Sequence, residues 1–312
     1  MPEDTISHMI KDFILHLLAA GRATSTIACY QHDLYHLARV LGKIQPQCIG
    51  DTDIARAVVR LFAAKRNGAR RSSATLNRIK SAYRSFFKWA FESKRIPSNP
   101  ANRLCLSKNH PRHTTPITAA EIMIFLETII QSDDIHAARD EALFATYAYT
   151  GLRRSEVLSL TLLDYDHVSG VLYLSRPKNG GRQLKIVPSP LADILKKRIR
   201  VVLRDHVSLT RSVFFPGRSA DQPMSARQVQ VRFDKWKKLA GIRKTLTIHS
   251  FRAGFATSLY ETTGDIFLVA RAMGHRDVST TMRYINTNSS VLRRAVEYTF
   301  QRPLKRNQMF AH

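Results

Sequence analysis

Four short stretches of the sequence carry side chains that could act together on a phosphate ester. They are TGLRRSEV at 150–157, RPKNGGRQ at 176–183, HSFR at 249–252 and RAMGHRDVSTTMRYIN at 271–286. Guanidinium and imidazole groups donate hydrogen bonds to phosphate oxygens, and nearby cations lower the pKa of a tyrosine enough to make it a usable nucleophile. These residue types therefore indicate attack on a phosphodiester.

Each stretch contributes one or two candidate residues. An arginine follows a glycine break, a lysine lies in a turn, a histidine and an arginine one helical turn apart share a helix face, and a tyrosine follows a histidine by nine residues. Taken singly, each has an ordinary role as a surface, capping or core residue. The candidates are Arg153, Lys178, His249, Arg252, His275 and Tyr284.

The sequence has no motif for a nucleotide or a metal. It contains no GxxxxGK, GxGxxG or HExxH pattern, and its acidic residues lie singly or at the starts of helices. We therefore expect chemistry on nucleic acid that uses no metal and no other cofactor.

The charge of the chain points to a polyanionic partner. Lys and Arg number 49 against 24 acidic residues, a net charge of +25, and both halves of the chain are basic. With 312 residues the chain is long enough for two domains, both of which could face duplex DNA. The three cysteines have neither metal-ligand nor disulfide spacing, and no apolar stretch is long enough for a membrane span, so we expect a cytoplasmic protein.

Residues 1–108 read as a helical domain. Apolar residues recur at helical spacing over 5–20, 25–41, 51–67 and 72–93, with capping residues in front and glycine or proline behind. A proline-bearing segment follows, from which we take 109–117 as the linker.

Residues 118–312 read as a second, mainly helical domain with one hairpin. Strands are expected at 171–175 and 184–187, around the turn signal Asn179-Gly180. The fold class is thus mainly α with a small β-sheet in the C-terminal domain. Helices are expected at 118–130, 136–150, 155–164, 190–204, 225–240, 250–262, 265–273, 278–286 and 288–300.

Together, the four stretches resemble the tyrosine recombinase family of phage integrases and Xer-like recombinases. The family pattern is an arginine in TGLRxSE, a hairpin lysine, HxxR, and GH with a tyrosine nine positions later, and this chain has every element in order. The resemblance covers almost the whole chain, including TLNRIKSAYRSFFKWA at 75–90. Ala253 departs from the histidine of many members, YINT departs from the commoner YxH, and a longer hairpin leaves Lys185 as an alternative to Lys178.

The resemblance implies a mechanism. Tyr284 would form a 3′-phosphotyrosyl link and release a 5′-hydroxyl, with Arg153 and Arg252 on the non-bridging oxygens. His249 would contact the same phosphate or manage the tyrosine proton. His275 would bind the phosphate and place the tyrosine, and Lys178 would protonate the leaving oxygen. The link conserves the bond energy, so strands are rejoined through a Holliday junction without a cofactor.

It also implies that both domains bind DNA, as a core-binding (SAM-like) domain and a catalytic domain in a C-shaped clamp. The candidates lie in RRSSATLNRIK at 70–80 and in MSARQVQVRFDKWKK at 224–238. They are Arg70, Arg71, Ser73, Thr75, Asn77, Arg78, Lys80, Arg227, Gln228 and Gln230.

The implied partner is double-stranded DNA with inverted-repeat core sites. Four protomers would bind it, all of this chain or shared with a related recombinase, joined by the segment after Tyr284; accessory proteins are compatible with this assembly. We expect a nucleoid-associated protein of a bacterium or mobile element, and a two-domain recombinase without a further arm-binding domain.

Two other functions are open. A catalytically silent DNA-binding regulator would keep the clamp without the chemistry, and a DNA-relaxing enzyme of the topoisomerase IB kind would share the catalytic logic. The sequence does not distinguish integration, excision, dimer resolution and transposon movement, and it does not give the target site.

Overall fold

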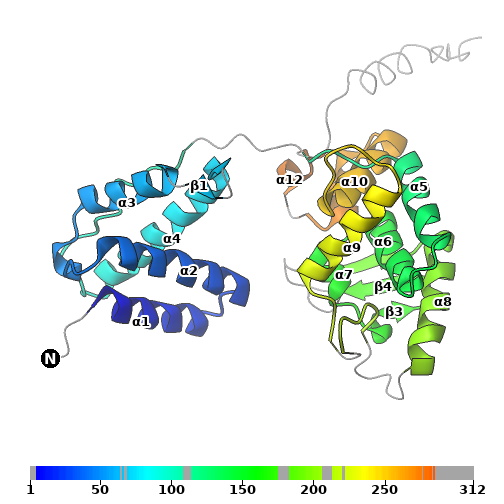
Figure 1. The fold of residues 1–312 in the computed structure, drawn as a ribbon, viewed down its shortest axis with the longest axis horizontal. Helices are drawn as coiled ribbons and strands as arrows, with labels where there is room; N and C mark the ends of the chain where they lie inside the picture. Colours follow the sequence, from blue (N-terminus) through cyan, green and yellow to red (C-terminus); the bar gives the residue numbers. More distant parts are fainter. Residues whose placement is uncertain are drawn as a thin grey trace, which may run out of the picture. The chain divides into compact units, whose positions relative to one another are not determined.

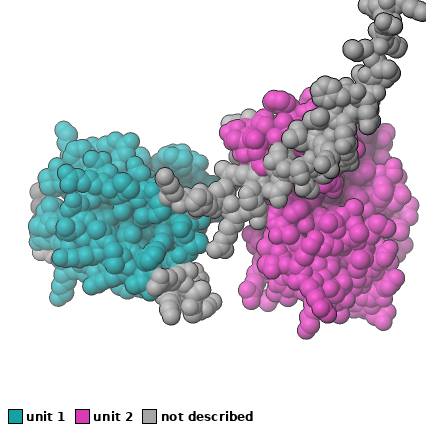
Figure 2. Space-filling model, turned by 90° about the horizontal axis from the view of Figure 1, so that it is seen from above, with its two compact units in different colours: residues 1–111 teal, residues 112–312 magenta. Residues whose placement is uncertain are grey.

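A computed structural model of the chain describes most of its residues and divides it into two compact units. The units are residues 1–111 and 112–312, coloured separately in Figure 2. The described residues are 5–63, 65–66, 69–107, 114–174, 183–205, 213–219, 222–275, 277–282 and 284.

The first unit is built from four α-helices. They are α1 (Ile6–Ala19), α2 (Thr24–Leu41), α3 (Asp51–Ala63) and α4 (Ser73–Glu92), with a 3₁₀ turn at Pro46–Cys48. Thr5 and Ser72 cap α1 and α4 with their side chains, as expected for hydroxyl residues ahead of an apolar repeat. The apolar faces meet in one core, where Phe13 packs edge-on against Phe86 at 5.5 Å between ring centroids.

The third helix is shorter than the sequence predicted. The expectation of a helix to residue 67 was wrong, because α3 ends at Ala63 and β1 (Lys65–Arg66) then pairs with β2 (Ala69–Arg70). Asn67-Gly68, between the two strands, is a strong sequence signal for a tight hairpin, and it outweighs the helical spacing before it.

The second unit places helices around a small antiparallel sheet (Figure 1). Strands β3 (Tyr165–Asp166), β4 (Val171–Leu174) and β5 (Gln183–Ile186) lie in that order, with Leu172 opposite Lys185. The helices are α5 (Ala119–Ile130), α6 (Ala137–Thr150), α7 (Arg154–Leu158), α8 (Ser189–Asp205), α9 (Ala226–Leu239), α10 (His249–Thr263), α11 (Ile266–Met273) and α12 (Val278–Met282). The predicted class, mainly helical with a small sheet, is confirmed.

Helix α6 forms the middle of this unit and packs against α5, α8 and α10. Its side chains are buried on almost every face, and the rings of Phe125, Phe144, Phe233 and Phe251 cluster around it at 5.1–6.2 Å between centroids. Ile117, just before α5, is also buried here, and its N–H donates to the carbonyl of Ser250 at 3.2 Å. A rigid core of this kind fixes the end of α6, three residues before Arg153, and the start of α10, which carries Arg252.

The segment after α7 differs from its prediction. A helix over 155–164 was expected, but α7 stops at Leu158 and residues 162–164 form a 3₁₀ turn. The N–H and hydroxyl of Thr161 both donate to the Asp164 carboxylate at 2.8 Å, and the N–H of Phe214 donates to Leu160 at 3.0 Å. These contacts supply the backbone with partners outside a helix, so the chain turns into β3.

In the part of the chain that the structure describes, every helix is too short or too polar to span a lipid bilayer.

Candidate active site

Arg153 is placed by a sharp break between two helices. Helix α6 ends at Gly151, which has a left-handed φ of 60° and lies so close to Phe255 that a side chain would collide with its ring. Arg153 then caps α7. The buried carboxylate of Glu156 accepts the Arg153 N–H at 2.8 Å and pairs with its guanidinium at 2.8 Å. The arginine is therefore held at two points, with its side chain one-fifth exposed.

Arg252 is buried at the centre of the site. Its guanidinium donates to the carbonyl of Gly151, to the carbonyl of Met273 at 2.8 Å and to Nε2 of His275 at 2.8 Å. The side chain is 3% exposed. Arg252 thus connects the end of α6, the end of α11 and a candidate histidine, all from the first turn of α10.

His275 and Tyr284 lie together, as their spacing suggested. Their rings are nearly parallel, at 6.0 Å between centroids, and Nδ1 of His275 is 2.8 Å from the hydroxyl oxygen of Thr281. The Tyr284 carbonyl accepts a hydrogen bond from the hydroxyl of Thr257 at 3.2 Å, and the Tyr284 side chain lies close enough to Arg252 to raise the pKa of its guanidinium. The phenol is thereby brought to the buried guanidinium.

His249 begins α10 and reaches the surface beside these groups. Partial desolvation, followed by the charges of Arg154, Arg252 and Arg153, lowers the pKa of its imidazole. The ring therefore favours its neutral form, in which one nitrogen can donate and the other accept.

The hairpin contributes a buried lysine. Lys178 lies outside the described residues, but Lys185 on β5 is 6% exposed and its ammonium group donates to the carbonyl of Ala272. Burial, together with the charges of Arg252 and Arg153 against that of Glu156, lowers the pKa of Lys185 to about 8. The lysine that the sequence left as the alternative is thus part of the charged cluster.

The strand that carries Lys185 is also packed on the turn before His275. Gly274 has a φ of 65°, and a side chain there would overlap the amide of Gln183. Two cations bind carbonyls in the last turn of α11, Lys185 at Ala272 and Arg252 at Met273. Cations are stabilised at a helix C-terminus, so this turn is fixed from two sides.

The electrostatics of the cluster suit an incoming anion. Burial and the neighbouring Arg153 lower the pKa of Arg252, while Tyr284 and Glu156 raise it. Burial and the charges of Arg252, Arg153 and Lys185 lower the pKa of His275 to about 4, against the opposing effect of Glu156. Three cations around one carboxylate leave an excess of positive charge, which a phosphodiester oxygen would neutralise.

The described residues hold no group of three or more His, Cys, Asp or Glu side chains arranged for a metal ion.

Several candidate DNA contacts in the first unit have partners within the protein. Arg78 pairs with the buried Asp33 of α2, at 3.1 Å for one of its two hydrogen bonds. Asn77 and Lys80 bind the segment after α4, with Asn77 donating to the Ser107 carbonyl at 2.8 Å and Lys80 to the Cys105 carbonyl at 3.0 Å. These side chains shape the unit, and their role in binding DNA stays a prediction.

The other four candidates lie around the start of α4. Arg71 donates to the carbonyl of Leu61 at 2.9 Å, which joins α3 to α4. Ser73 is exposed, the hydroxyl of Thr75 is 3.0 Å from that of Ser72, and the backbone of Arg70 lies in β2. The N-terminus of α4 therefore presents Ser73 to solvent beside a capped first turn.

The candidates on α9 lie on its first turns. Arg227 is exposed, Gln228 forms a capping box with Ser225 at 2.7 and 3.2 Å, and Gln230 donates to Asp234 at 3.0 Å. Of these three, Arg227 presents its charge to solvent.

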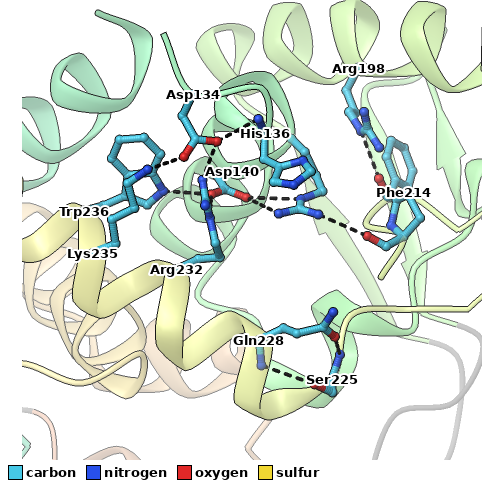
Figure 3. Close-up of polar contacts among 12 residues, drawn as sticks. Asp134, His136, Asp140, Arg198, Phe214, Ser225, Gln228, Arg232, Lys235 and Trp236 are labelled. Atoms are coloured by element: carbon cyan, nitrogen blue, oxygen red, sulfur yellow. Dashed lines mark hydrogen bonds and ion pairs between the residues drawn. The ribbon is translucent and has the colours of Figure 1, made fainter. Parts of the chain in front are cut away.

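Helix α9 is anchored to α6 by a buried carboxylate, drawn in Figure 3. Asp140 accepts hydrogen bonds from Arg139 at 3.0 Å, from the indole of Trp236 at 2.8 Å and from Arg232. Asp134 also pairs with Arg232, at 2.8 Å. Because Asp140 is fully buried, its charge depends on such donors for stabilisation.

We expect Asp140→Asn to destabilise the second unit by about 3 kcal/mol, since removing one partner of a buried ion pair leaves the other uncompensated. Urea unfolding in a Trp89→Phe background, where the remaining Trp236 reports this unit, measures the effect. Asp234→Asn, an exposed change on α9, is the control and should shift stability by less than about 0.5 kcal/mol. Equal urea midpoints for Asp140→Asn and Asp234→Asn would contradict the role of Asp140 in anchoring α9 to α6.

Thr281 is a contact of the site that sequence reasoning did not single out. It was seen only as part of the Ser-Thr-Thr run before Tyr284. Its position six residues after His275 is the available signal, but only the turn at α12 shows that the two side chains meet.

Models of known protein families match both parts of the chain. Residues 114–290 match the model of the phage integrase family, and residues 10–94 match its N-terminal SAM-like domain. Tyrosine recombinase XerC of Chromobacterium violaceum is 27% identical over 299 residues, 96% of each chain. XerC of Xanthomonas campestris pv. campestris (strain B100) is 29% identical over 285 residues, 90% of this chain and 84% of the relative.

Solved structures share the fold. The XerH site-specific recombinase bound to palindromic difH substrate, in a post-cleavage complex, aligns with a TM-score of 0.70 at 19% identity, covering 91% of this chain and 82% of that one. The integrase of the Tn1549 transposon, in complex with a circular intermediate DNA, aligns with a TM-score of 0.69 at 19% identity, covering 94% and 99%.

Proposed function

This chain belongs to the phage integrase family of tyrosine recombinases, and from that premise we propose that Tyr284 is the nucleophile with which it cuts DNA. The protein is a site-specific recombinase that cleaves and rejoins DNA strands. The observation that carries the proposal for Tyr284 is the meeting of three side chains. Arg252 hydrogen-bonds His275, whose ring is stacked on that of Tyr284, and the Tyr284 side chain raises the pKa of the Arg252 guanidinium.

The phenol oxygen attacks a phosphodiester, forms a 3′-phosphotyrosyl bond and breaks the bond to the 5′-oxygen of the next nucleotide. Arg153 and Arg252 bind the non-bridging oxygens, where negative charge grows in the transition state. The presence of Arg153 beside the buried Glu156 supports this role, because the ion pair holds its guanidinium before DNA binds.

Protons are handled by the neighbouring bases. His249, exposed and with a lowered pKa, takes the tyrosine proton or donates to the phosphate, and His275 orients Tyr284. Lys178 protonates the leaving 5′-oxygen, a role that rests on the resemblance. Lys185 helps to hold the last turn of α11 in place, because its ammonium group donates to the Ala272 carbonyl.

Rejoining reverses the attack. A 5′-hydroxyl from a second strand displaces Tyr284, so the energy of the broken bond is kept in the phosphotyrosyl link and strand exchange passes through a Holliday junction. We infer four protomers on inverted-repeat core sites of duplex DNA, of this chain alone or with a related recombinase, joined by the segment after Tyr284 and open to accessory proteins. We place this reaction on the DNA of the nucleoid.

Both units bind the DNA in this proposal. The net charge of +25 supports a large electrostatic contribution to binding. Ser73 at the start of α4 and Arg227 on α9 are exposed, which supports direct contacts by these two side chains. Arg70, Arg71, Thr75, Asn77, Arg78, Lys80, Gln228 and Gln230 remain proposed contacts.

A covalent trapping experiment on random sequences tests the proposal and selects the target site in the same step. The protein is mixed with nicked duplexes of randomised sequence in EDTA. Cleavage near the nick releases a short fragment, so the cut cannot be rejoined and the covalent protein–DNA intermediate accumulates. We expect an adduct that resists denaturation with detergent and that, when sequenced, gives one family of sites.

The other outcomes point to the alternative functions. DNA binding without an adduct would favour a silent regulator. Adducts on unrelated sequences, together with relaxation of supercoiled plasmid, would favour an enzyme of the topoisomerase kind. An adduct that disappears in EDTA would contradict a site based on arginine and histidine.

A further inference from the structure

Thr281 is a fully buried hydroxyl residue that contacts two parts of the active site. Its side-chain oxygen lies 2.8 Å from Nδ1 of His275, and its carbonyl accepts the N–H of Tyr284 at 2.9 Å. A buried hydroxyl needs a partner, and among the described residues the hydrogen bond found for this one is to the imidazole of His275.

The hydrogen bonds of His275 determine which of its nitrogens carries the proton. Nε2 lies 2.8 Å from a guanidinium nitrogen of Arg252, and a guanidinium can only donate. Nε2 must therefore accept with its lone pair. In the neutral ring the proton is then on Nδ1, and this N–H donates to the Thr281 hydroxyl.

The surroundings favour that neutral ring. Burial and three cations (Arg252, Arg153 and Lys185) lower the pKa of His275 to about 4, with Glu156 acting in the opposite direction. A second proton on the imidazole would have to face Arg252, which offers no acceptor.

We propose that Thr281 is a positioning residue that, together with Arg252, holds His275 as the Nδ1-protonated tautomer: Arg252 requires a lone pair at Nε2, and the Thr281 hydroxyl gives the buried Nδ1–H its acceptor. This inference rests on the proposed function of the site. A hydroxyl can accept from Nδ1–H or donate to an unprotonated Nδ1. Thr281 therefore keeps a hydrogen bond to the ring when a phosphate oxygen replaces Arg252 at Nε2, which then has to carry a proton.

Three variants separate the hydroxyl from the packing. Thr281→Val keeps the shape of the side chain and removes the hydrogen bond, while Thr281→Ser keeps the hydroxyl and removes a methyl group. Thr280→Val is the matched control on the same helix, where the side chain is half-buried. All three keep the backbone carbonyl that binds the Tyr284 N–H.

The first measurement uses the full chain without DNA. Long-range proton–nitrogen spectra of protein labelled with ¹⁵N-histidine show which ring nitrogen is protonated, and comparison with His275→Gln identifies the signal. We expect the Nδ1-protonated form in the unmodified protein, in Thr281→Ser and in Thr280→Val. Thr281→Val should shift His275 toward a mixture of tautomers.

The second measurement is single-turnover cleavage of a trapped site. We expect Thr281→Val to slow cleavage about tenfold, the effect of losing one well-placed hydrogen bond, with DNA binding unchanged. Thr281→Ser and Thr280→Val should stay within about twofold.

An unchanged tautomer in Thr281→Val would overturn the inference, as would equal losses of cleavage in Thr281→Val and Thr281→Ser, which would mean that packing alone matters. Absence of cleavage by the unmodified protein would refute the proposed function instead, and the spectra would still decide the role of Thr281 in setting the tautomer.

Discussion

Replacing Tyr284 with phenylalanine is expected to abolish covalent attachment to DNA while leaving DNA binding intact. The change removes one oxygen and keeps the ring, which stacks on His275 and packs beside Val269 and Met273. We expect cleavage to fall by at least about 10⁴-fold, the scale of losing a nucleophile. Detergent-resistant adducts with nicked duplexes measure the chemistry, and gel shifts measure the binding.

Tyr260 supplies the matched control for this experiment. It is a half-buried tyrosine that packs in the same small apolar cluster, formed by α10 and α11. Tyr260→Phe therefore removes the same atom from a tyrosine that packs on the same apolar cluster, and we expect its adducts to be as abundant as those of the unmodified protein. Adducts that persist in Tyr284→Phe would show that another residue attacks the phosphate.

Replacing Arg153 with glutamine is expected to slow cleavage by about 10²–10³-fold, equivalent to roughly 3–4 kcal/mol of transition-state stabilisation. Glutamine keeps a donor but loses the charge that opposes the growing negative charge on the phosphate. The local fold should persist, because Glu156 still accepts the backbone N–H of residue 153. Rates are measured in single turnovers at saturating protein.

Arg204, exposed near the end of α8, gives a control with the same change in net charge. We expect Arg204→Gln to retain the cleavage rate of the unmodified protein. If Arg153→Gln lost binding and cleavage in equal measure, its role would be to hold DNA. A rate equal to that of the unmodified protein would remove Arg153 from the mechanism.

Much of the site could be predicted because its members lie in short motifs. His249 and Arg252 are one helical turn apart, and glycines mark the breaks before Arg153 and His275. Such signals are local, since they depend on helix periodicity and on the left-handed conformation that glycine adopts readily. The same local signals predicted most helix starts and the hairpin of β4 and β5.

Contacts between distant segments could not be predicted. The pairing of Arg78 with Asp33 joins α4 to α2, and nothing in either segment identifies the partner. Arg78 was interpreted as a DNA contact because it lies in the basic stretch at the start of α4, although a buried carboxylate also selects arginine. The end of α7 was misjudged for a similar reason, because Phe214, far along the chain, binds the carbonyl of Leu160.

The choice between the two hairpin lysines also shows what the sequence alone could not predict. Both Lys178 and Lys185 lie near the predicted hairpin, and the sequence favoured Lys178 because it precedes Asn-Gly. The pairing of Leu172 with Lys185 places the second lysine in the returning strand, and the ladder register turns its side chain inward to Ala272. Register depends on the partner strand and on what covers the sheet, so one strand's sequence does not specify it.

The acceptors that hold Arg252 and Lys185 are main-chain carbonyls of Gly151, Ala272 and Met273. Every amino acid supplies this group, so substitution at 272 or 273 can change packing but cannot delete the acceptor. Substitutions there keep the hydrogen bond as long as the backbone conformation is unchanged. Substitution of Arg252 or Lys185 removes the donor itself. A library that randomises positions 272 and 273 together with 185 and 252 should therefore tolerate more variety at the two carbonyl positions than at the two cations.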